Sequence, residues 1–293
     1  MRMSTWIRQH LAALRALLVL TVITGIVYPV AVFAVAQLPG LKDKADGSLI
    51  ERDGKVVGSS LIGQSFTDAG GKVLVQYFQS RPSAAGSSGY DPTASGASNL
   101  GPESMVDSAP DKPALLTTVC ARSKAIGELE GVDGSRPFCT PGGVGAVLSV
   151  IGPRAADGEV EQPAKVVSVN EFCAVTQRPF LATYLGVRVE CAAAGEDYSL
   201  GRMVPIRGDA PARPAVPADA VTAGGSGLDP NISPQYADLQ IARVAEARKV
   251  SPDQIKAVVE AHSYGRDLGF FGEPRVNVVE LNLDLDGKYP VRG

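Results

Sequence analysis

The chain has 293 residues, of which 45% are hydrophobic and 20% are charged, and its formal net charge at pH 7 is −3. This hydrophobic content excludes a wholly disordered chain, and the slightly acidic balance argues against a nucleic-acid-binding protein, which normally carries a basic excess. With two histidines, the chain has few imidazole ligands for a zinc site and few candidates for histidine-based catalysis.

The charge is distributed unevenly along the chain. Residues 1–40 contain three basic residues, Arg2, Arg8 and Arg15, and no acidic residue, so this segment carries +3. The remaining residues have 25 basic against 31 acidic side chains, a net charge of −6. The basic segment also holds the one long apolar run of the sequence, so charge and hydropathy together indicate a membrane.

The apolar run, residues 16–38, has 23 residues without a charge. At about 1.5 Å per residue, a helix of this length crosses a hydrocarbon core of about 30 Å. The preceding arginines predict a cytoplasmic N-terminus and an outer location for residues 41–293, although Lys42 and Lys44 weaken this orientation. Ala34-Val35-Ala36 leaves a cleaved signal peptide as the alternative. We favour a retained anchor, because the run exceeds the roughly 7–15 residues of a signal-peptide core.

Tyr28-Pro29 lies within the predicted span. Proline removes a backbone donor and kinks a helix, which a neighbouring helix can accommodate, and the nearby Gly25 offers a surface for close packing. A plain anchor with a tolerated kink is the alternative. A single span cannot line a pore by itself, so any transport function requires partner subunits.

The four cysteines all fall in the predicted outer region; they are Cys120, Cys139, Cys173 and Cys191. An even number in an oxidising compartment suggests disulfide bonds, and three full connectivities are possible. One or more buried thiols are the alternative. No C-x-x-C pair occurs, which argues against a zinc ribbon or a thioredoxin-type site.

The first elements predicted after the span are short strands. Residues 48–52 and 55–57 flank Asp53-Gly54, a pair typical of a two-residue type I′ hairpin turn. Residues 76–79 are a further candidate strand. The sequence therefore predicts a β-hairpin at the start of the outer region.

Residues 81–102 consist mainly of small and polar residues, with Gly, Ser and Pro dominant. That composition is typical of a flexible linker. However, Arg81, Tyr90, Asp91 and Asn99 supply side-chain chemistry that a pure Gly/Ser spacer lacks. An ordered loop that contacts a partner is therefore the sharper hypothesis.

Helical spacing of apolar residues predicts a helix over residues 114–129, which ends before Gly131. Residues 132–210 differ, because they contain three cysteines and several β-branched runs, and they are predicted to form an inserted β-rich subregion. The chain thus divides into an N-terminal segment with the span (1–40), two parts of an outer domain (41–131 and 211–293) and this insertion.

The C-terminal third is predicted to begin with two helices. Ser233-Pro234 and Ser251-Pro252 are N-cap signals with proline at the first helical position. The first helix extends to about Arg248 and the second ends near Gly265. Alternation of leucine with polar residues over 275–286 predicts a half-buried strand. Together these elements indicate an α+β outer domain on a single N-terminal transmembrane helix, with the β-rich insertion.

Catalytic motifs are not found in this sequence. It contains no P-loop, no G-x-S-x-G elbow and no H-E-x-x-H, and no spacing of carboxylates indicates an acid/base pair. His262 is the one possible catalytic imidazole outside the membrane, and a lone helical histidine is usually structural. Residues 224–230 are interpreted as a tight turn rather than an anion-binding nest.

Seven blocks occur in the order typical of one protein family. They are Tyr28-Pro29, GSLIERDGKVVGSSLIGQSF (47–66), YFQSRPSAAG (77–86), SGASNLGP (95–102), DAVTAGGSGLDPNISP (219–234), LQIARV (239–244) and EPRVNVVELNLDLD (273–286). On these blocks the chain resembles the C subunit of the Kdp potassium-transporting P-type ATPase, over roughly residues 10–130 and 211–287. The insertion has no counterpart in compact family members, and Asn231 stands where many relatives have histidine.

The resemblance implies a single-span accessory subunit of the bacterial cell membrane that is not catalytic on its own. Its partners would be a potassium-binding, channel-like subunit and a P-type subunit that hydrolyses ATP, so that the complex handles ATP and K⁺ and this chain binds no cofactor or metal tightly. The absence of D-K-T-G-T and T-V-G-Y-G motifs is compatible with this role. A hydrolase or a binding module unrelated to transport is the alternative.

The family is described as a catalytic chaperone that raises the apparent affinity of the pump subunit for ATP. A helical glutamine is proposed to touch the nucleotide, and the matching residue is Gln240. ATP is cytoplasmic, whereas the predicted topology places Gln240 outside, so we favour an assembly and gating role. The expected partner contacts are Tyr28, Pro29, Arg81, Ser98 and Asn99.

Overall fold

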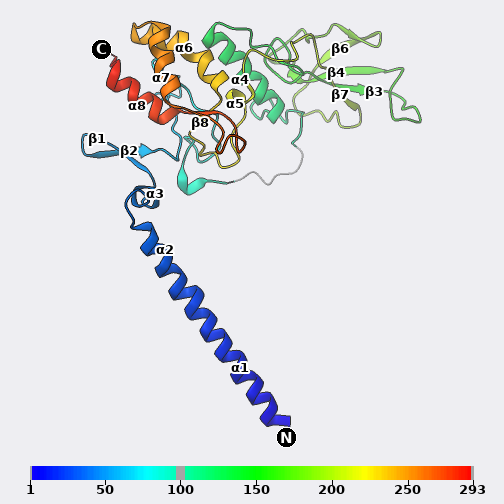
Figure 1. Ribbon diagram of the computed structural model, residues 1–293. Helices are drawn as coiled ribbons and strands as arrows, with labels where there is room; N and C mark the ends of the chain where they lie inside the picture. The colour runs from blue at the N-terminus through cyan, green and yellow to red at the C-terminus, as the bar shows by residue number, and fades with distance from the viewer. Residues whose placement is uncertain (1, 97–102, 292–293) are drawn as a thin grey trace. The chain divides into compact units, whose positions relative to one another are not determined.

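The computed structural model describes residues 2–96 and 103–291, and it divides into two compact units, Met1–Leu61 and Ile62–Gly293. The first unit contains a long apolar helix, a short second helix and a β-hairpin. The long helix comprises α1 (Arg2–Val22), a π-helical turn η1 (Ile23–Val27) and α2 (Tyr28–Ala36). Figure 1 shows these three parts as one continuous rod, in dark blue.

After the short helix α3 (Lys42–Ala45), β1 (Leu49–Arg52) pairs antiparallel with β2 (Lys55–Ser59). Asp53 and Gly54 between them both have positive φ, 52° and 73°. Positive φ at both central residues is the requirement of a type I′ turn, whose twist matches that of the flanking strands. The predicted hairpin is confirmed.

The second unit contains a main body and a separate mixed sheet. Among its described residues, the body contains five helices, one 3-10 turn and three short strands. They are α4 (Leu115–Glu130), α5 (Ala218–Val221), α6 (Pro234–Arg248), α7 (Pro252–Ala261), α8 (Val278–Lys288), η2 (Pro92–Ala94), β8 (Asn231–Ile232), β9 (Ser263–Tyr264) and β10 (Arg275–Asn277). The strands form an antiparallel sheet in the order β8-β10-β9. The predicted α+β class is confirmed.

Helix α6 begins where the sequence predicts, because the Ser233 side chain accepts a hydrogen bond from the backbone N–H of Tyr236. In α7 the Ser251 and Gln254 side chains form a complete capping box. This helix ends at Ala261 rather than near Gly265. Strand β9 starts at Ser263, and the His262 carbonyl accepts a hydrogen bond from the backbone N–H of Asn277. The chain therefore forms sheet hydrogen bonds from this point instead of continuing the helix.

The predicted strand over residues 275–286 is wrong beyond its first three residues. Strand β10 ends at Asn277, whose side chain accepts hydrogen bonds from the backbone N–H groups of Val279 and Glu280 and so caps α8. The buried residues of α8 are Val278, Val279, Leu281, Asn282 and Leu285. The spacing of these buried residues is that of one face of a helix. The alternation of leucine with polar residues, which predicted a strand, therefore arose from residues of an amphipathic helix.

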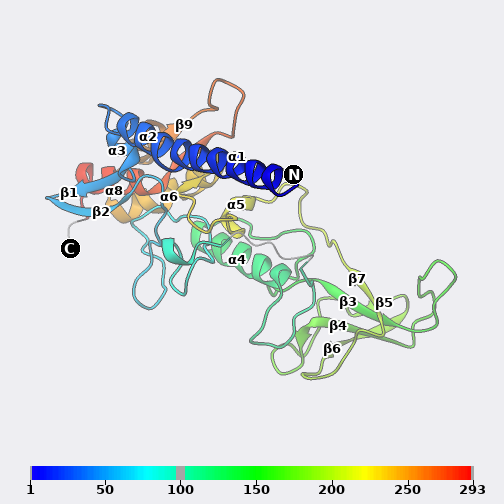
Figure 2. The same ribbon diagram turned by 90° about the horizontal axis from the view of Figure 1, so that it is seen from below.

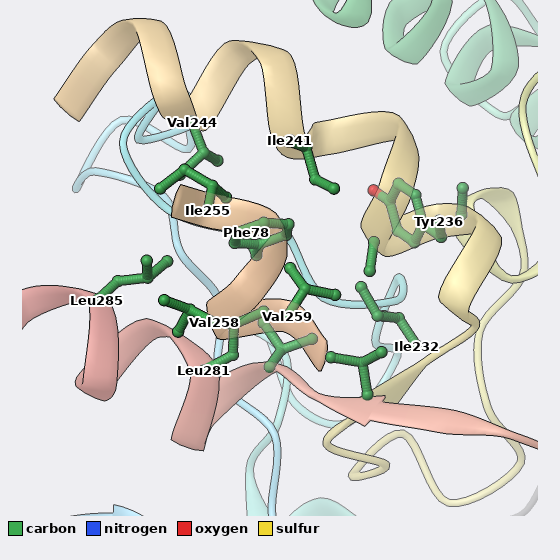
Figure 3. Packing of buried hydrophobic residues seen from close by; sticks show 14 of the residues in the cluster. Phe78, Ile232, Tyr236, Ile241, Val244, Ile255, Val258, Val259, Leu281 and Leu285 are labelled. Atoms are coloured by element: carbon green, nitrogen blue, oxygen red, sulfur yellow. The ribbon is translucent and has the colours of Figure 1, made fainter. Parts of the chain in front are cut away.

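The apolar core of the body lies between α6, α7 and α8. Phe78, which is fully buried, sits among side chains from all three helices and from β8 (Figure 3). These neighbours are Ile232, Ile241, Val244, Ile255, Val258, Val259, Leu281 and Leu285. Val119 and Ile126 of α4 pack against the same cluster. The core thus joins segments that lie far apart in the sequence.

The mixed sheet lies within the predicted insertion. Its strands are β3 (Val147–Ile151), β4 (Lys165–Phe172), β5 (Thr183–Tyr184), β6 (Val187–Ala192) and β7 (Arg202–Pro205), in the order β5-β6-β4-β3-β7. Strands β4 and β6 are parallel and the other pairs are antiparallel. Figure 2 shows the sheet in green beyond α4, and it has its own apolar cluster that includes Leu148, Val166 and Val189.

Candidate functional site

The apolar helix contains a deviation at the predicted kink. Over Ile23–Val27 the backbone is π-helical, and the N–H of Tyr28 bonds to the carbonyl of Ile23, five residues back. Pro29 has no N–H and its ring conflicts with the carbonyl four residues earlier, which belongs to Gly25. A π turn is one way to remove this conflict without breaking the helix.

From residue 16 to residue 36 the surface of this helix is apolar on all sides, apart from two threonines and a tyrosine. Ser4–Ala36 contains an 18-residue stretch with a mean hydropathy of 2.4, which is long and hydrophobic enough to cross a membrane, and none of this stretch is buried within the chain. Tyr28 is two-thirds exposed, and apart from the adjacent residues and the helix's own backbone, no atom lies within 4 Å of the position that a Cβ at Gly25 would occupy. A helix that is apolar all round is suited to lipid or to other helices.

Residues 75–79, here called the clamped segment, run through the body without a strand partner among the described residues. The predicted strand over 76–79 is therefore wrong. Instead, the Gln240 carboxamide accepts from the N–H of Gln79 (2.6 Å) and donates to its carbonyl (3.2 Å). The Asn282 carboxamide makes the same pair of bonds with Phe78, both at 2.9 Å. Two side-chain amides thus replace a neighbouring strand.

Two arginines of α6 complete the clamp. Arg243 donates to the carbonyls of Val75 and Tyr77, and Arg248 donates to the carbonyl of Gln76. The Arg243 side chain is almost fully buried and pairs with Glu130 of α4 at 2.9 Å. Burial raises the pKa of the Glu130 carboxyl, and the charge and hydrogen bond of Arg243 only partly oppose this. Gln240 itself is fully buried in this polar network.

The clamped segment leads directly into the predicted polar loop, of which the structure describes residues 81–96. Ser83 is its centre: its hydroxyl donates to the carbonyl of Gly227 (2.6 Å) and accepts from the N–H of Tyr90 (2.8 Å). Ser95 donates to the carbonyl of Ser226. The loop therefore packs on the Gly-rich turn at 224–229 of the same chain, which the composition alone did not indicate.

Tyr90 is the buried aromatic residue of the loop pair, that is, of the polar loop and the Gly-rich turn on which it packs. Its ring is buried, and its hydroxyl donates to the carbonyl of Arg81 at 2.7 Å. Burial raises the pKa of Tyr90 to about 12, so the phenol keeps its proton to a higher pH than an exposed tyrosine does. A side chain at Gly63 would collide with the Tyr90 ring, and one at Gly227 would meet Ala85 at 2.9 Å. Glycine is required at residue 63 because the ring lies so close to the backbone, and at residue 227 because Ala85 lies close and φ is 68°.

Arg81 lies at the edge of the loop pair. Its guanidinium reaches the Asp229 carboxylate at 3.4 Å, with the Arg81 side chain one-quarter exposed. Its Nε is buried and has no hydrogen-bond partner among the described residues. The Asp229 carboxylate also accepts from the backbone and the side chain of Asn231. The predicted contact residues Ser98 and Asn99 lie outside the described residues.

All four cysteines form disulfides, Cys120–Cys139 and Cys173–Cys191. The first joins α4 to the start of the inserted region, and the second joins the end of β4 to β6. At the base of the insertion, the N–H of Phe138 bonds to the carbonyl of Arg207. Both ends of the insertion therefore lie together beside α4.

A cavity of about 580 Å³ lies between the mixed sheet and the segment around Asp107. Its carboxylates are engaged: Asp107 accepts from Thr117, Glu196 from Tyr198 and Asp197 from the N–H of Ser199. No group of three or more His, Cys, Asp or Glu side chains within the described residues could hold a metal ion. The carboxylates of this cavity therefore act as local structural acceptors.

Comparison with known proteins identifies the family. The family model described as "K+-transporting ATPase, c chain", KdpC, matches residues 10–133 and 201–287. The chain belongs to this family.

Curated relatives extend the similarity to nearly the whole chain. The KdpC subunit of Kineococcus radiotolerans is 38% identical over 284 residues, which cover 97% of this chain and 96% of the relative. That of Mycobacterium tuberculosis is 37% identical (95% and 98%), and that of Gemmatimonas aurantiaca is 39% identical (95% and 92%). The alternative of an unrelated hydrolase or binding module is thereby removed.

The KdpC match also locates the predicted site residues. Tyr28, Pro29, Arg81 and Gln240 lie in the matched ranges, whereas Cys139, Cys173 and Cys191 lie in the unmatched stretch 134–200. These curated relatives nevertheless align across almost their entire length, so chains of this size, with room for the insertion, recur in the family. Gln79, Ser83, Asp229 and Asn282 were missed by sequence reasoning because their roles depend on contacts between distant segments.

Proposed function

We propose that this chain is a non-catalytic accessory subunit of an ATP-driven potassium-uptake complex. Its partners are a potassium-binding, channel-like subunit and a P-type subunit that hydrolyses ATP. The observation that carries the proposal is the KdpC match, which includes both the apolar helix and the body. Relatives that share more than a third of its residues are named as the KdpC subunit of a potassium-transporting ATPase.

In the proposed topology the N-terminus is cytoplasmic and residues 41–293 lie outside. Two observations support it. Arg2, Arg8 and Arg15 all precede the apolar run, which fits the positive-inside rule. The body and its insertion carry two disulfides, which persist in oxidising compartments and are rare in the cytosol.

The span acts as an assembly element in this proposal. Its apolar surface packs between helices of the partner subunits, and the π turn with Gly25 and Tyr28 provides a recess beside a large side chain. Small residues allow close approach of helices in lipid, where association depends on packing rather than on the hydrophobic effect. The outer region, at −6, raises the local K⁺ concentration modestly, and salt screens this effect.

Gln240 supports the fold in this proposal and does not contact nucleotide. Both ends of its carboxamide are bonded to Gln79, and Arg243 also donates to its oxygen at 2.8 Å. A nucleotide would have to displace these buried bonds. Any effect of the chain on the apparent ATP affinity of the complex then arises through assembly and gating.

The test is to purify the complex with and without this chain and to measure K⁺-stimulated ATP hydrolysis. We expect activity to be lost on deletion and restored by co-expression. Gly25→Leu, which fills the recess, is expected to weaken co-purification, whereas Ala16→Leu adds bulk in the regular part of α1 and serves as control. Full activity and unchanged ATP affinity without this chain would contradict the proposal.

A further inference from the structure

The loop between β9 and β10 presents an apolar tip to solvent. Leu268, Phe270 and Phe271, here called the apolar tip, are 83%, 65% and 58% exposed. The two phenyl rings lie against each other, with centroids 4.2 Å apart. Figure 2 shows this loop projecting from the body next to β9. The tip therefore exposes three large apolar side chains together.

The tip is held outward by a defined turn. Asp267 and Phe271 form an antiparallel backbone bridge, and Leu268 and Gly269 between them have φ of 54° and 83°. Positive φ at two successive residues is a turn geometry with a strong conformational preference for glycine at the second position. Because Leu268 adopts it, the side chain with the largest exposure in this loop is fixed at the apex.

The base of the loop is charged but electrically balanced. Arg266 pairs with Glu273 at 2.7 Å, and Arg275 pairs with Asp267 at 3.6 Å. Arg275 also lies over the ring of Tyr264, 5.6 Å from its centroid. The loop thus changes from apolar at its apex to polar and neutral at its base. A lipid–water interface changes in the same way from acyl chains to headgroups, and aromatic rings and arginines lie at the headgroup level.

We propose that the apolar tip inserts into the surface of the lipid bilayer that carries this chain's own span. The body begins at Ile62, soon after the apolar helix ends, so the bilayer is present at high effective concentration and a weak anchor suffices. A protein interface needs about 800 Å² from each partner, more than three side chains at a turn provide. The balanced base means that insertion does not require anionic lipid.

The experiment uses the full chain in phosphatidylcholine vesicles with bromine on the acyl chains, which quenches tryptophan inserted among them. Trp6, the one native tryptophan, is replaced by Phe, and Leu268→Trp places a probe at the apex. Leu200→Trp is the matched control, because Leu200 is 84% exposed and lies in the insertion. We expect brominated lipid to quench the probe at 268 at least about two-fold and the probe at 200 far less.

Each other outcome overturns the proposal. Unquenched fluorescence at 268, or equal quenching at 268 and 200, would show that the tip has no specific lipid contact. A probe at 268 that is shielded from both bromolipid and aqueous acrylamide only in the assembled complex would assign the tip to a protein partner. Quenching that appears only with phosphatidylglycerol would contradict the neutral-base mechanism. Circular dichroism matching the parent chain establishes that the variants are folded.

Discussion

The body and the insertion of the outer region are stabilised in different ways. In the body, the clamped segment at residues 75–79 is fixed by side chains of α6 and α8, among them Gln240, Arg243 and Asn282. In the insertion, backbone ladders join five strands and the Cys173–Cys191 disulfide closes one end. The comparison teaches that the family-matched body supplements its apolar core with a buried network of polar side chains, whereas the insertion supplements its own apolar cluster with strand ladders and a disulfide.

The largest predicted effect on stability concerns the carboxamides of Gln240 and Asn282, which hold the clamped segment in the body. Gln240→Ala or Asn282→Ala leaves one buried N–H and one buried carbonyl of the clamped segment unpaired. Because each orphaned group costs about 1–3 kcal/mol, we expect either variant to lower the free energy of unfolding by about 3–4 kcal/mol. Urea unfolding of the full chain in detergent measures this. Gln235→Ala on the exposed side of α6 is the control, with an expected change under about 0.5 kcal/mol.

The same two variants, Gln240→Ala and Asn282→Ala, also distinguish a structural role of Gln240 from a contact with nucleotide. Asn282 makes an equivalent clamp but is not the glutamine that the family proposal concerns. We therefore expect Gln240→Ala and Asn282→Ala to change the apparent Michaelis constant of the assembled complex for ATP equally. A selective rise for Gln240→Ala alone would support direct contact with ATP and contradict our assignment.

The Cys173–Cys191 disulfide is predicted to affect the insertion only. Its cysteines are 18 residues apart, and a loop of this size is stabilised by about 3 kcal/mol on closure, which is slightly less than the clamp. In Cys173→Ala/Cys191→Ala, amide hydrogen exchange should accelerate over residues 134–200 and stay unchanged in α6 and α7. K⁺-stimulated ATP hydrolysis by the complex should be retained. Faster exchange in α6 would show that the two regions unfold as one unit.

Cys120–Cys139 is the matched comparison for that variant, because its two cysteines are 19 residues apart and the closed loop is nearly the same size. Cys120 is buried in α4, which packs against the body core through Val119 and Ile126. Opening this disulfide should therefore accelerate exchange in α4 as well as in the insertion. The two double variants together show whether the boundary between body and insertion lies at α4.

Local signals in the sequence were sufficient for much of the fold. The Asp53-Gly54 turn and the Ser-Pro starts of α6 and α7 depend on neighbouring residues, and all three were predicted from them. The α8 helix was missed because Leu281, Leu283 and Leu285 fit a strand at period two. Its N-cap, Asn277, was the local signal that favours a helix, but it was interpreted as part of the strand.

The candidate site was less predictable because its contacts join distant segments. Arg81 was singled out as part of the polar loop, yet its partner Asp229 lies 148 residues further along the chain. Gln240 and Gln79 are 161 residues apart, and no periodicity relates them. A glutamine on the buried face of α6 could have indicated a polar network in the core, because buried carboxamides require partners.

The smallest predicted effect concerns Asp284 of α8. Its carboxylate lies 2.9 Å from Nε2 of His262 and 2.8 Å from Nζ of Lys288. Burial raises the pKa of Asp284, but the hydrogen bonds and charges of Lys288 and His262 outweigh this and leave the pKa below its ordinary value of 3.8. A carboxyl with a depressed pKa stabilises the folded state above its unfolded-state pKa, and this contribution is lost as the pH falls through the folded value.

We therefore expect Asp284→Asn to lower the free energy of unfolding by less than about 1 kcal/mol at pH 7, since the carboxylate is partly exposed and screened by solvent. The difference from the parent chain should shrink once the pH falls below 3.8. Urea midpoints between pH 7 and pH 3 measure it, with Asp238→Asn at an exposed position of α6 as control. If the difference instead grew as the pH fell, the carboxylate would not be the stabilising form, and the link between α7 and α8 would have to depend on packing alone.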